Sequence, residues 1–365
     1  MDSVLAAAAR FSFQNRVTAV WDYGHGNVND TFLVKLDGGA EKHFILQRLN
    51  TRVFPEPGLV MQNLRVYSEH VHRRLLNTPP NSGRRWETPR VLLTQDGGDH
   101  WVDYQGSFWR ALSFIESTRA YDTIQDSGHA EEVGYALGMF HLLVSDLPAI
   151  RLADTLPGFH VTPCYLMRYD EIIEQHRSHT SPEVEYALEF IRVRRGWASV
   201  LEQAREDGTL TMRPIHGDPK VNNVMLDLAT GQAVSLIDLD TIKPGLVQYD
   251  LGDCLRSGCN PLGEETADWE SVRFESAYCR AILEGYLSKA RDFLTAGDYE
   301  YLYDGIRLIA FELGLRFFTD YLAGNVYFKA QHPQHNLARA LVQFKLTENI
   351  ESQESAIRNL IRELR

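Results

Sequence analysis

Hydrophobic and polar positions in the first third of the chain follow the two-residue period of β-strands. Residues 31–36 (TFLVKL) and 43–49 (HFILQRL) are β-rich runs on either side of the turn residues Asp37, Gly38 and Gly39. Two such runs around a short turn predict a β-hairpin. Three further runs separated by turn residues predict a three-stranded meander at 91–94, 100–104 and 108–115.

One helix is expected between these strands. Apolar side chains in residues 59–76 recur at the spacing of a single helix face, at Leu64, Tyr67, Val71 and Leu75. Residues 1–115 are therefore expected to form a five-stranded antiparallel sheet with one inserted helix.

Beyond about residue 120 the pattern changes to the period of amphipathic helices. Helices are expected at 130–143, within 181–206, 269–294 and 297–322, and from about 335 to the end. A β-type island interrupts them, with runs at 223–225 and 233–237 around a Thr230-Gly231 turn. A β-rich region (1–115) followed by a mainly helical region (116–365) predicts an α+β protein with two lobes, joined by a connector that begins at Glu116.

The composition of the 365 residues is that of a globular protein, since 44% are hydrophobic and 24% charged. These values exclude disordered, collagen-like and coiled-coil classes. At roughly 150 residues per domain, the length fits about two domains or one bilobal unit. The net charge of −12 and the lack of a Lys/Arg run argue against nucleic acid as the main partner.

The sequence also argues against membrane partners and against a cysteine framework. No segment approaches the ~20 apolar residues that cross a bilayer, and the first residues, MDSVLAAAARF, lack the basic region of a targeting signal. We therefore expect a cytoplasmic protein without membrane contact, and favour a monomer. The four cysteines contain no CxxC pair, and we expect ordinary buried thiols at Cys164, Cys254, Cys259 and Cys279.

The most informative stretch reads H-x-D-x-x-x-x-N, from His216 through Asp218 to Asn223, and is followed by Asp238 at the end of a hydrophobic run. Phosphoryl transfer asks a protein mainly for positioning and electrostatic stabilisation. It needs a carboxylate to orient or deprotonate the attacking hydroxyl, which Asp218 supplies, and hard oxygen ligands for Mg²⁺, which Asn223 and Asp238 supply. A polar turn between two strands is the structural alternative, and the full set of positions favours the chemistry.

These motifs resemble the catalytic loop and metal aspartate of the aminoglycoside phosphotransferase-like kinases, which have the protein-kinase fold. Further segments resemble the N-acetylhexosamine 1-kinases of that superfamily, at 23–34, 44–55, 108–116, 237–245, 249–256, 314–328 and 332–337. The resemblance extends from about Tyr23 to Leu346. It implies transfer of phosphate from ATP, with Mg²⁺, to the anomeric 1-hydroxyl of GlcNAc or GalNAc, giving an N-acetyl-α-hexosamine 1-phosphate and ADP.

The resemblance also assigns roles to single residues. It makes Asp218 the catalytic base, Asn223 and Asp238 the Mg²⁺ ligands, and Arg316 and Tyr327 sugar ligands. The alternative for Arg316 is a structural ion pair with Asp320 or Glu312, and for Tyr327 it is simple packing.

Four more residues are weaker candidates for contact with the sugar. Asn29, Asp30 and Thr31 lie in the segment that would reach its polar substituents. Ser257 stands where the sugar kinases carry a bulky aromatic residue, so the resemblance leaves the identity of the sugar open.

Candidate nucleotide contacts come from four places in the sequence. Gly24 and Gly26 precede the first hairpin, where bare backbone N–H groups approach phosphates, although a plain turn is the alternative. Phe114 and Ile115 lie in the hinge at residues 113–116, which leads into the connector and whose backbone would read the adenine edge. Gln47 occupies the position of the strand lysine of many kinases. Arg48 points to the opposite face of the strand, so phosphate charge would fall to Mg²⁺ and Lys220, and the partner of Glu69 stays open.

Three other polar residues near the motif are given structural readings. His216 is expected to brace the loop backbone, and Asp250 to cap a helix or anchor the loop. Asp240 would assist at the metal or hold the second hairpin strand.

Two other functions compete with the sugar kinase. One is a kinase of the same superfamily for another acceptor, such as a hexose, an amino sugar, an amino alcohol or an aminoglycoside. A cationic acceptor would need an acidic pocket, whereas an Arg316-Tyr327 pair suits a neutral polyol. The other is a catalytically silent nucleotide- or sugar-binding module, which the intact set of Asp218, Asn223 and Asp238 argues against.

Overall fold

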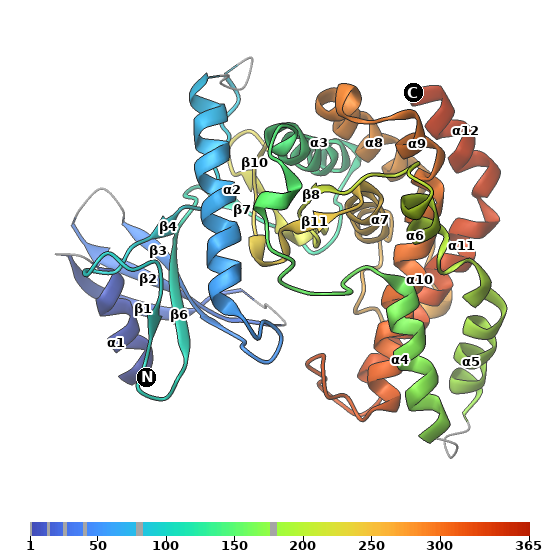
Figure 1. The fold of residues 1–365 in the computed structure, drawn as a ribbon, viewed down its shortest axis with the longest axis horizontal. Helices are drawn as coiled ribbons and strands as arrows, with labels where there is room; N and C mark the ends of the chain where they lie inside the picture. The colour runs from blue at the N-terminus through green and yellow to red at the C-terminus, as the bar shows by residue number, and fades with distance from the viewer. Residues whose placement is uncertain (1, 13–14, 25–27, 39–41, 78–82, 176–180) are drawn as a thin grey trace.

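The computed structural model describes residues 2–12, 15–24, 28–38, 42–77, 83–175 and 181–365. A six-stranded antiparallel sheet occupies one side of the molecule and helices the other (Figure 1). The sheet contains β1 (Arg16–Asp22), β2 (Asp30–Asp37), β3 (His43–Leu49), β4 (Val91–Leu92), β5 (Trp101–Val102) and β6 (Phe108–Ser113). Their order is β1-β2-β3-β6-β4, and β5 also pairs with β6. The antiparallel sheet is confirmed, with one strand more than expected.

The expected hairpin and the expected meander have different outcomes. Strands β2 and β3 form the hairpin, with Thr31 opposite Gln47. In a meander β5 would lie between β4 and β6, but both short strands pair with β6 itself. The meander was therefore wrong, because β4 and β5 lie end to end along one edge of β6.

The two faces of the sheet have different neighbours. Helix α1 (Asp2–Phe11), which was not expected, packs its Ala7, Ala8 and Phe11 on a face formed by Val34, Leu36, Phe44, Leu46, Trp109 and Ala111. Because side chains alternate along a strand, Gln47 and Arg110 lie on the opposite face. That face turns toward the helical region.

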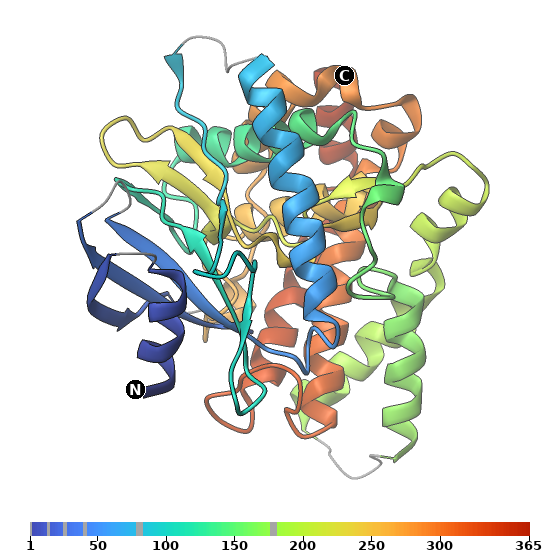
Figure 2. The same ribbon diagram turned by 60° about the vertical axis from the view of Figure 1, so that its left-hand side comes forward.

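Helix α2 (Pro57–Asn77) confirms the helix expected at 59–76 and runs between the sheet and the helical region (Figure 2). Its apolar face, including Leu64, Tyr67 and Val71, belongs to a core shared with the helical region. The Asn63 side chain donates to the carbonyls of Ala153 and Ile242, both at 2.8 Å. Helix α2 therefore joins the two parts of the molecule.

The helical region contains ten α-helices in the described residues. They are α3 (Ser127–Val144), α4 (Thr162–Gln175), α5 (Pro182–Arg194), α6 (Val200–Glu206), α7 (Val247–Gly258), α8 (Ser276–Ala290), α9 (Ala296–Glu300), α10 (Leu302–Leu322), α11 (His335–Ser352) and α12 (Glu354–Leu364). The expected helices are present, and α4 is one that the sequence pattern missed. None of the described helices is long and apolar enough to span a membrane.

Helices α3 and α8 approach so closely that only glycine fits between them. A Cβ at Gly134 would lie 1.9 Å from the Ile282 carbonyl oxygen, and one at Gly285 would lie 2.0 Å from that of Glu131. Larger residues at either position would force the helices apart. Helix α3 of this pair also packs against β8 (Arg213–Ile215) and β10 (Ala233–Leu236), next to the motif loop of 216–223.

Two small sheets frame the motif residues. The island expected at 223–237 is confirmed as a hairpin of β9 (Val224–Asp227) and β10 (Ala233–Leu236), which β7 (Thr118–Arg119) extends. Strand β8 (Arg213–Ile215) pairs with β11 (Lys243–Gly245). The loop with Asp218 runs from β8 to β9, and the turn with Asp238 runs from β10 to β11, so the two segments lie side by side.

The cysteines are free, as the lack of a disulfide pattern indicated. Cys254, Cys259 and Cys279 are buried, as expected, but Cys164 is exposed. The expectation of burial was wrong for Cys164, because this residue lies on the outer face of the first turn of α4.

Candidate active site

The backbone of the motif loop is held by a buried carboxylate on α7. Asp250 accepts hydrogen bonds from the backbone N–H groups of His216 and Gly217, both at 2.7 Å, and its Oδ2 lies 3.0 Å from His141 Nε2. Both Asp250 and His141 are fully buried. The loop-anchor reading of Asp250 is therefore the one the geometry supports.

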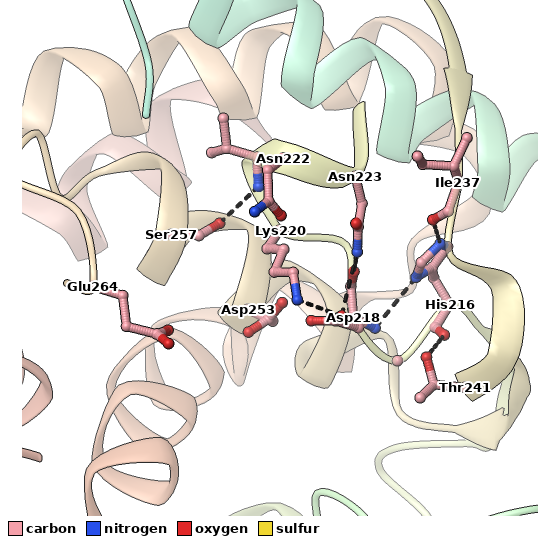
Figure 3. A network of polar contacts seen from close by, with 12 residues as sticks. His216, Asp218, Lys220, Asn222, Asn223, Ile237, Thr241, Asp253, Ser257 and Glu264 are labelled. Atoms are coloured by element: carbon pink, nitrogen blue, oxygen red, sulfur yellow. Dashed lines mark hydrogen bonds and ion pairs between the residues drawn. The ribbon is translucent and has the colours of Figure 1, made fainter. Parts of the chain in front are cut away.

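His216 fixes the loop from within. Its Nδ1 accepts from the Asp218 backbone N–H at 3.2 Å, which leaves Nε2 to donate to the Ile237 carbonyl at 3.0 Å (Figure 3). Burial lowers the pKa of the imidazole despite the nearby Asp250. A neutral ring with these two bonds joins the loop to the end of β10, so His216 braces the backbone as expected.

Asp218 extends from this braced loop and contacts two side chains. Its Oδ2 lies 2.8 Å from Lys220 Nζ and 3.3 Å from Asn223 Nδ2, which also donates to the Asp218 carbonyl at 2.7 Å (Figure 3). Burial alone would raise the pKa of this carboxyl, but the Lys220 ammonium outweighs it and the pKa is lowered. Asp218 is therefore an ionised acceptor at neutral pH, available to a hydroxyl.

Asp238 follows β10 in a left-handed conformation, with φ 62° and ψ 58°. Residues other than glycine adopt this region at a cost, and such strain is typical of functional sites. Desolvation and the like charges of Asp240 and Asp218 raise the pKa of its carboxyl to about 7. The Asp238 carboxyl is therefore buried within the electrostatic influence of two other acids.

Asn223 and Asp238 fit the requirements of a hard cation. The Asn223 amide nitrogen is bonded to Asp218, which leaves its side-chain oxygen as the atom that could bind a metal. Among the described residues, no cluster of three or more His, Cys, Asp or Glu side chains could hold a metal ion. One carboxylate and one amide suit Mg²⁺, which keeps several waters and binds substrate phosphates along with one or two carboxylates.

Asp240 makes its contacts with the sheet and not with the hairpin. Its Oδ2 accepts from Asn29 Nδ2 at 2.7 Å, and its Oδ1 lies 2.5 Å from Arg110 Nη2. The Arg110 side chain is 1% exposed and that of Asp240 4%. The sequence reading missed Arg110, although a single charge within the apolar strand 108–113 was a signal that could have found it.

Gln47, at the position of the strand lysine, binds Arg110 and a neighbouring strand. Its Oε1 accepts from Arg110 Nε at 3.0 Å and Nη2 at 2.7 Å, and its Nε2 donates to Thr31 Oγ1 at 3.1 Å. Arg48 lies on the other face, as expected, where it bonds Asp30. The carboxylate of Asp30 is therefore on the far side of the sheet from Gln47, which counts against the sugar contact expected for Asp30.

The helix α2 residue Glu69 does not fill the role of a lysine partner. Glu69 is exposed, and no ion pair of its carboxylate occurs among the described residues.

The connector between the two regions is built around one aromatic side chain. Phe114 makes edge contacts with Tyr23 and His43, at centroid distances of 5.8 and 5.7 Å. Ile115 is buried, and its carbonyl accepts from the Thr118 hydroxyl at 2.8 Å. Gly24 has φ 74°, and an added Cβ would meet nothing within 4 Å. Gly26, the other glycine of the expected phosphate loop, lies outside the described residues.

Arg316 and Tyr327 meet at a cavity of about 230 Å³ between the two regions. The Arg316 guanidinium lies over the rings of Tyr165, Phe159 and Phe328, 5.0 to 5.4 Å from their centroids. It forms no ion pair with Asp320 or Glu312, so the structural alternative for Arg316 was wrong. Tyr327 is 47% exposed, which is more than a packing role requires.

The two acids near Arg316 have other partners. Glu312 accepts from His160 Nδ1 at 2.9 Å and from the Thr162 hydroxyl at 2.7 Å. Asp320 accepts from the backbone N–H groups of residues 326, 327 and 328, at 2.8 to 3.0 Å. Asp320 therefore holds the loop that carries Tyr327 against α10.

Ser257 lies under the motif loop and does not line this cavity. Its hydroxyl accepts from the Val221 backbone N–H at 3.2 Å (Figure 3) and donates to the Cys254 carbonyl at 3.1 Å. The sugar contact expected for Ser257 stays a prediction, since both bonds of its hydroxyl are with backbone groups of the motif loop and of α7.

A model of a phosphotransferase enzyme family (APH) matches residues 22–287, more than half of the chain. Among solved structures, the chain is similar to a microcompartment-associated aminopropanol kinase, at 15% identity over 98% of each chain with a TM-score of 0.60. It is similar to a choline kinase from Cryptosporidium parvum at 15% identity, over 95% of this chain and 93% of that chain, with a TM-score of 0.55.

A third similar structure contains a nucleotide. It is a spectinomycin phosphotransferase in complex with ADP and spectinomycin, at 12% identity over 94% of this chain and 95% of that chain, with a TM-score of 0.55. At such identities the likeness concerns the fold. The expected protein-kinase-like fold of the aminoglycoside phosphotransferase type is confirmed.

Proposed function

Because the chain belongs to the phosphotransferase enzyme family, we propose that it transfers the γ-phosphoryl group of ATP to the anomeric hydroxyl of GlcNAc or GalNAc. In this proposal, residues 1–115 form the nucleotide lobe and residues 116–365 the lobe that binds the acceptor. The connector at Phe114 and Ile115, with Gly24 before the first hairpin, would hold the nucleotide. The similar structures include complexes with ADP and with GDP, which supports a purine nucleotide, and the choice of ATP rests on the resemblance to the sugar kinases.

Asp218 is the group that would act on the acceptor. Its ionised carboxylate would accept the proton of the 1-hydroxyl as the oxygen attacks the γ-phosphorus, and the bonds from Lys220 and Asn223 would keep it in position. General-base catalysis of this kind contributes about 10²–10⁴-fold. Asn223 and Asp238 would hold Mg²⁺, which neutralises phosphate charge during the transfer.

The observation that carries the choice of acceptor is the environment of Arg316. A guanidinium without an ion pair among the described residues lines a cavity of about 230 Å³ together with aromatic rings. A second guanidinium, that of Arg168, lines the same cavity. This volume is below the roughly 300–1,000 Å³ of pockets for drug-sized ligands, and it suits one sugar ring with donors and acceptors of its own.

Cationic acceptors are the main alternative, since the similar structures include an aminopropanol kinase and a choline kinase. Two acids beside Asp218, Asp253 and Glu264, are the groups that could bind an amine there. Arg256 pairs with both, at 2.7 and 3.2 Å. One guanidinium shared by two carboxylates leaves one negative charge at this place, so the case for a neutral acceptor rests on the Arg316 guanidinium in the cavity.

The test is ADP release with Mg-ATP against GlcNAc, GalNAc, glucose, galactose, glucosamine, ethanolamine and kanamycin. We expect turnover with the N-acetylated sugars, none with the amines, and none with Asp218→Asn. Arg316→Gln should raise the KM for the sugar at least tenfold and leave the KM for ATP nearly unchanged. Turnover with an amine and not with a sugar would overturn the proposed acceptor while keeping the phosphotransferase.

A further inference from the structure

The sheet lacks the lysine with which protein kinases pair the α- and β-phosphates of ATP. The residue at that position, Gln47, is uncharged. Its cross-strand neighbour is Arg110, which pairs with it in register between β3 and β6. Residues opposite each other on antiparallel strands project from the same face. A cation therefore exists on this face, one strand away from the usual position.

Gln47 holds that cation in one orientation. Because its amide nitrogen donates to Thr31 Oγ1, its oxygen must face Arg110, and it accepts from two nitrogens of the guanidinium. A lysine at position 47 would instead place a second positive charge against Arg110. Gln47 therefore supplies the acceptor and Arg110 the positive charge, and together they take the place of the single strand lysine.

The guanidinium spans the boundary between the sheet and the helical region. Its Nη2 lies 2.5 Å from Asp240 Oδ1, and Asp240 belongs to the turn that carries Asp238. Asn29, just before β2, donates to the other Asp240 oxygen at 2.7 Å. Two groups from the sheet thus hold both oxygens of one carboxylate in the turn.

The charges in this turn need a counterion. Asp240 lies two residues after Asp238 in the same turn, and the Arg110 guanidinium is the cation that pairs with Asp240. In addition, Arg110 Nη1 is buried and has no hydrogen-bond partner among the described residues. This donor is the part of the guanidinium that neither Gln47 nor Asp240 occupies.

We propose that Arg110 is the positioning residue that replaces the strand lysine: it fixes Asp240, and with it the turn whose Asp238 would hold the Mg²⁺ that binds the phosphates of the nucleotide. The inference rests on the phosphotransferase chemistry proposed above and not on the identity of the acceptor. A purely structural ion pair would make a different prediction. If Arg110 acts on the phosphates, its loss should weaken the binding of a nucleotide more than the binding of a nucleoside.

The experiment compares nucleotide and nucleoside binding by calorimetry in four proteins. They are wild type, Arg110→Gln, the double variant Gln47→Lys/Arg110→Gln, and Arg48→Gln as the matched control. The control removes an arginine from the same sheet, but one in an exposed pair with Asp30 on the other face, where such pairs contribute little.

Arg110→Gln should weaken MgATP binding at least tenfold and adenosine binding less than twofold. The double variant moves the cation to the usual strand position and should recover at least half of that loss on a logarithmic scale. Arg48→Gln should bind both ligands as the wild type does. Thermal unfolding of each variant reports whether it is folded.

Three results would overturn the proposal. Equal losses for MgATP and adenosine in Arg110→Gln would make the pair merely structural. A folded double variant that shows no recovery of MgATP binding would mean that the charge cannot be moved to strand β3, and failure of both variants to fold would make Arg110 a structural residue. Failure of the wild type to bind adenosine and MgATP would instead contradict the kinase function itself, so the two failures are distinguishable.

Discussion

His160 Nε2 lies 2.8 Å from the carbonyl oxygen of Gly217, the residue before Asp218, while its Nδ1 lies 2.9 Å from Glu312 Oε1. Both partners are acceptors, so both ring nitrogens must donate, and the ring is an imidazolium. Burial alone would lower its pKa, but the charges of Glu312 and Asp253 and its two hydrogen bonds raise it. Since Glu312 is one helical turn before Arg316, His160 joins the motif loop to the helix that lines the acceptor cavity.

This arrangement predicts a pH-dependent part of the free energy of unfolding. A histidine whose folded pKa is raised stabilises the protein fully below its ordinary pKa, near 6.5, and less as pH rises through the raised value. His160→Gln should remove that component and lower the free energy of unfolding by about 3–5 kcal/mol at pH 6, because the buried Glu312 loses its ion-pair partner and keeps only the hydrogen bond from Thr162. Denaturant unfolding at pH 6 and pH 9 measures both quantities.

Glu312→Gln is the matched variant, since it removes the other charge of the same pair. It should lose the same pH-dependent component. If either variant kept the wild-type change in stability between pH 6 and pH 9, the imidazolium assignment would be wrong.

A second prediction concerns the cation site at Asp238. Chelation of divalent ions should abolish turnover, and Asp238→Asn should raise the Mg²⁺ concentration for half-maximal activity at least tenfold, because a charged oxygen ligand is lost. Titration of activity with MgCl₂ at saturating ATP measures this. Asp227→Asn is the control, since the Asp227 carboxylate caps the hairpin turn at Thr230. An unchanged Mg²⁺ requirement in Asp238→Asn would argue against Asp238 as a ligand.

A third prediction concerns the loop that carries Tyr327. Asp320 accepts three backbone N–H groups of that loop and one from Asn336 Nδ2 at 3.0 Å. Asp320→Asn replaces one acceptor oxygen with an amide donor, so we expect about a tenfold rise in the acceptor KM with little change in the ATP KM.

Initial rates with each substrate varied in turn would measure both constants. Asp304→Asn, on the same helix, is the control, because Asp304 pairs with Arg307 and Arg358 and does not line the cavity. Equal rises in both KM values for Asp320→Asn would point to general loosening of the fold instead of a positioned loop.

Local sequence patterns were enough to predict the parts of the fold in which hydrophobic positions recur with a strong period. The β2–β3 hairpin, helix α2 and the β9–β10 hairpin lie close to their expected ranges because each has a buried face and a defined turn. Strand β1 is mostly exposed or half-buried, so it carries no clean hydrophobic alternation. The two-residue strands β4 and β5 depend on the edge of β6, which no local pattern specifies.

The same limit applies to the site. Asp218, Asn223 and Asp238 lie within 21 residues of one another in a recognisable motif, and the structure brings Asp218 and Asn223 into contact. By contrast, Arg110 meets Asp240 from 130 residues away, and His160 meets Gly217 from 57 residues away. Such contacts depend on how the sheet and the helices pack: the lone charge in strand 108–113 marks Arg110 as unusual, but its partners Gln47 and Asp240 follow only from the three-dimensional structure.

The most direct test of the central claim is the position of the phosphate on the product. The wild-type enzyme would be incubated with Mg-ATP and GlcNAc, and phosphorus–proton correlation NMR would identify the phosphorylated oxygen, with Asp218→Asn as the blank. The account predicts phosphate on the anomeric oxygen in the α configuration, and no product from the variant. Phosphate on any other oxygen, or product formation by Asp218→Asn at the wild-type rate, would contradict it.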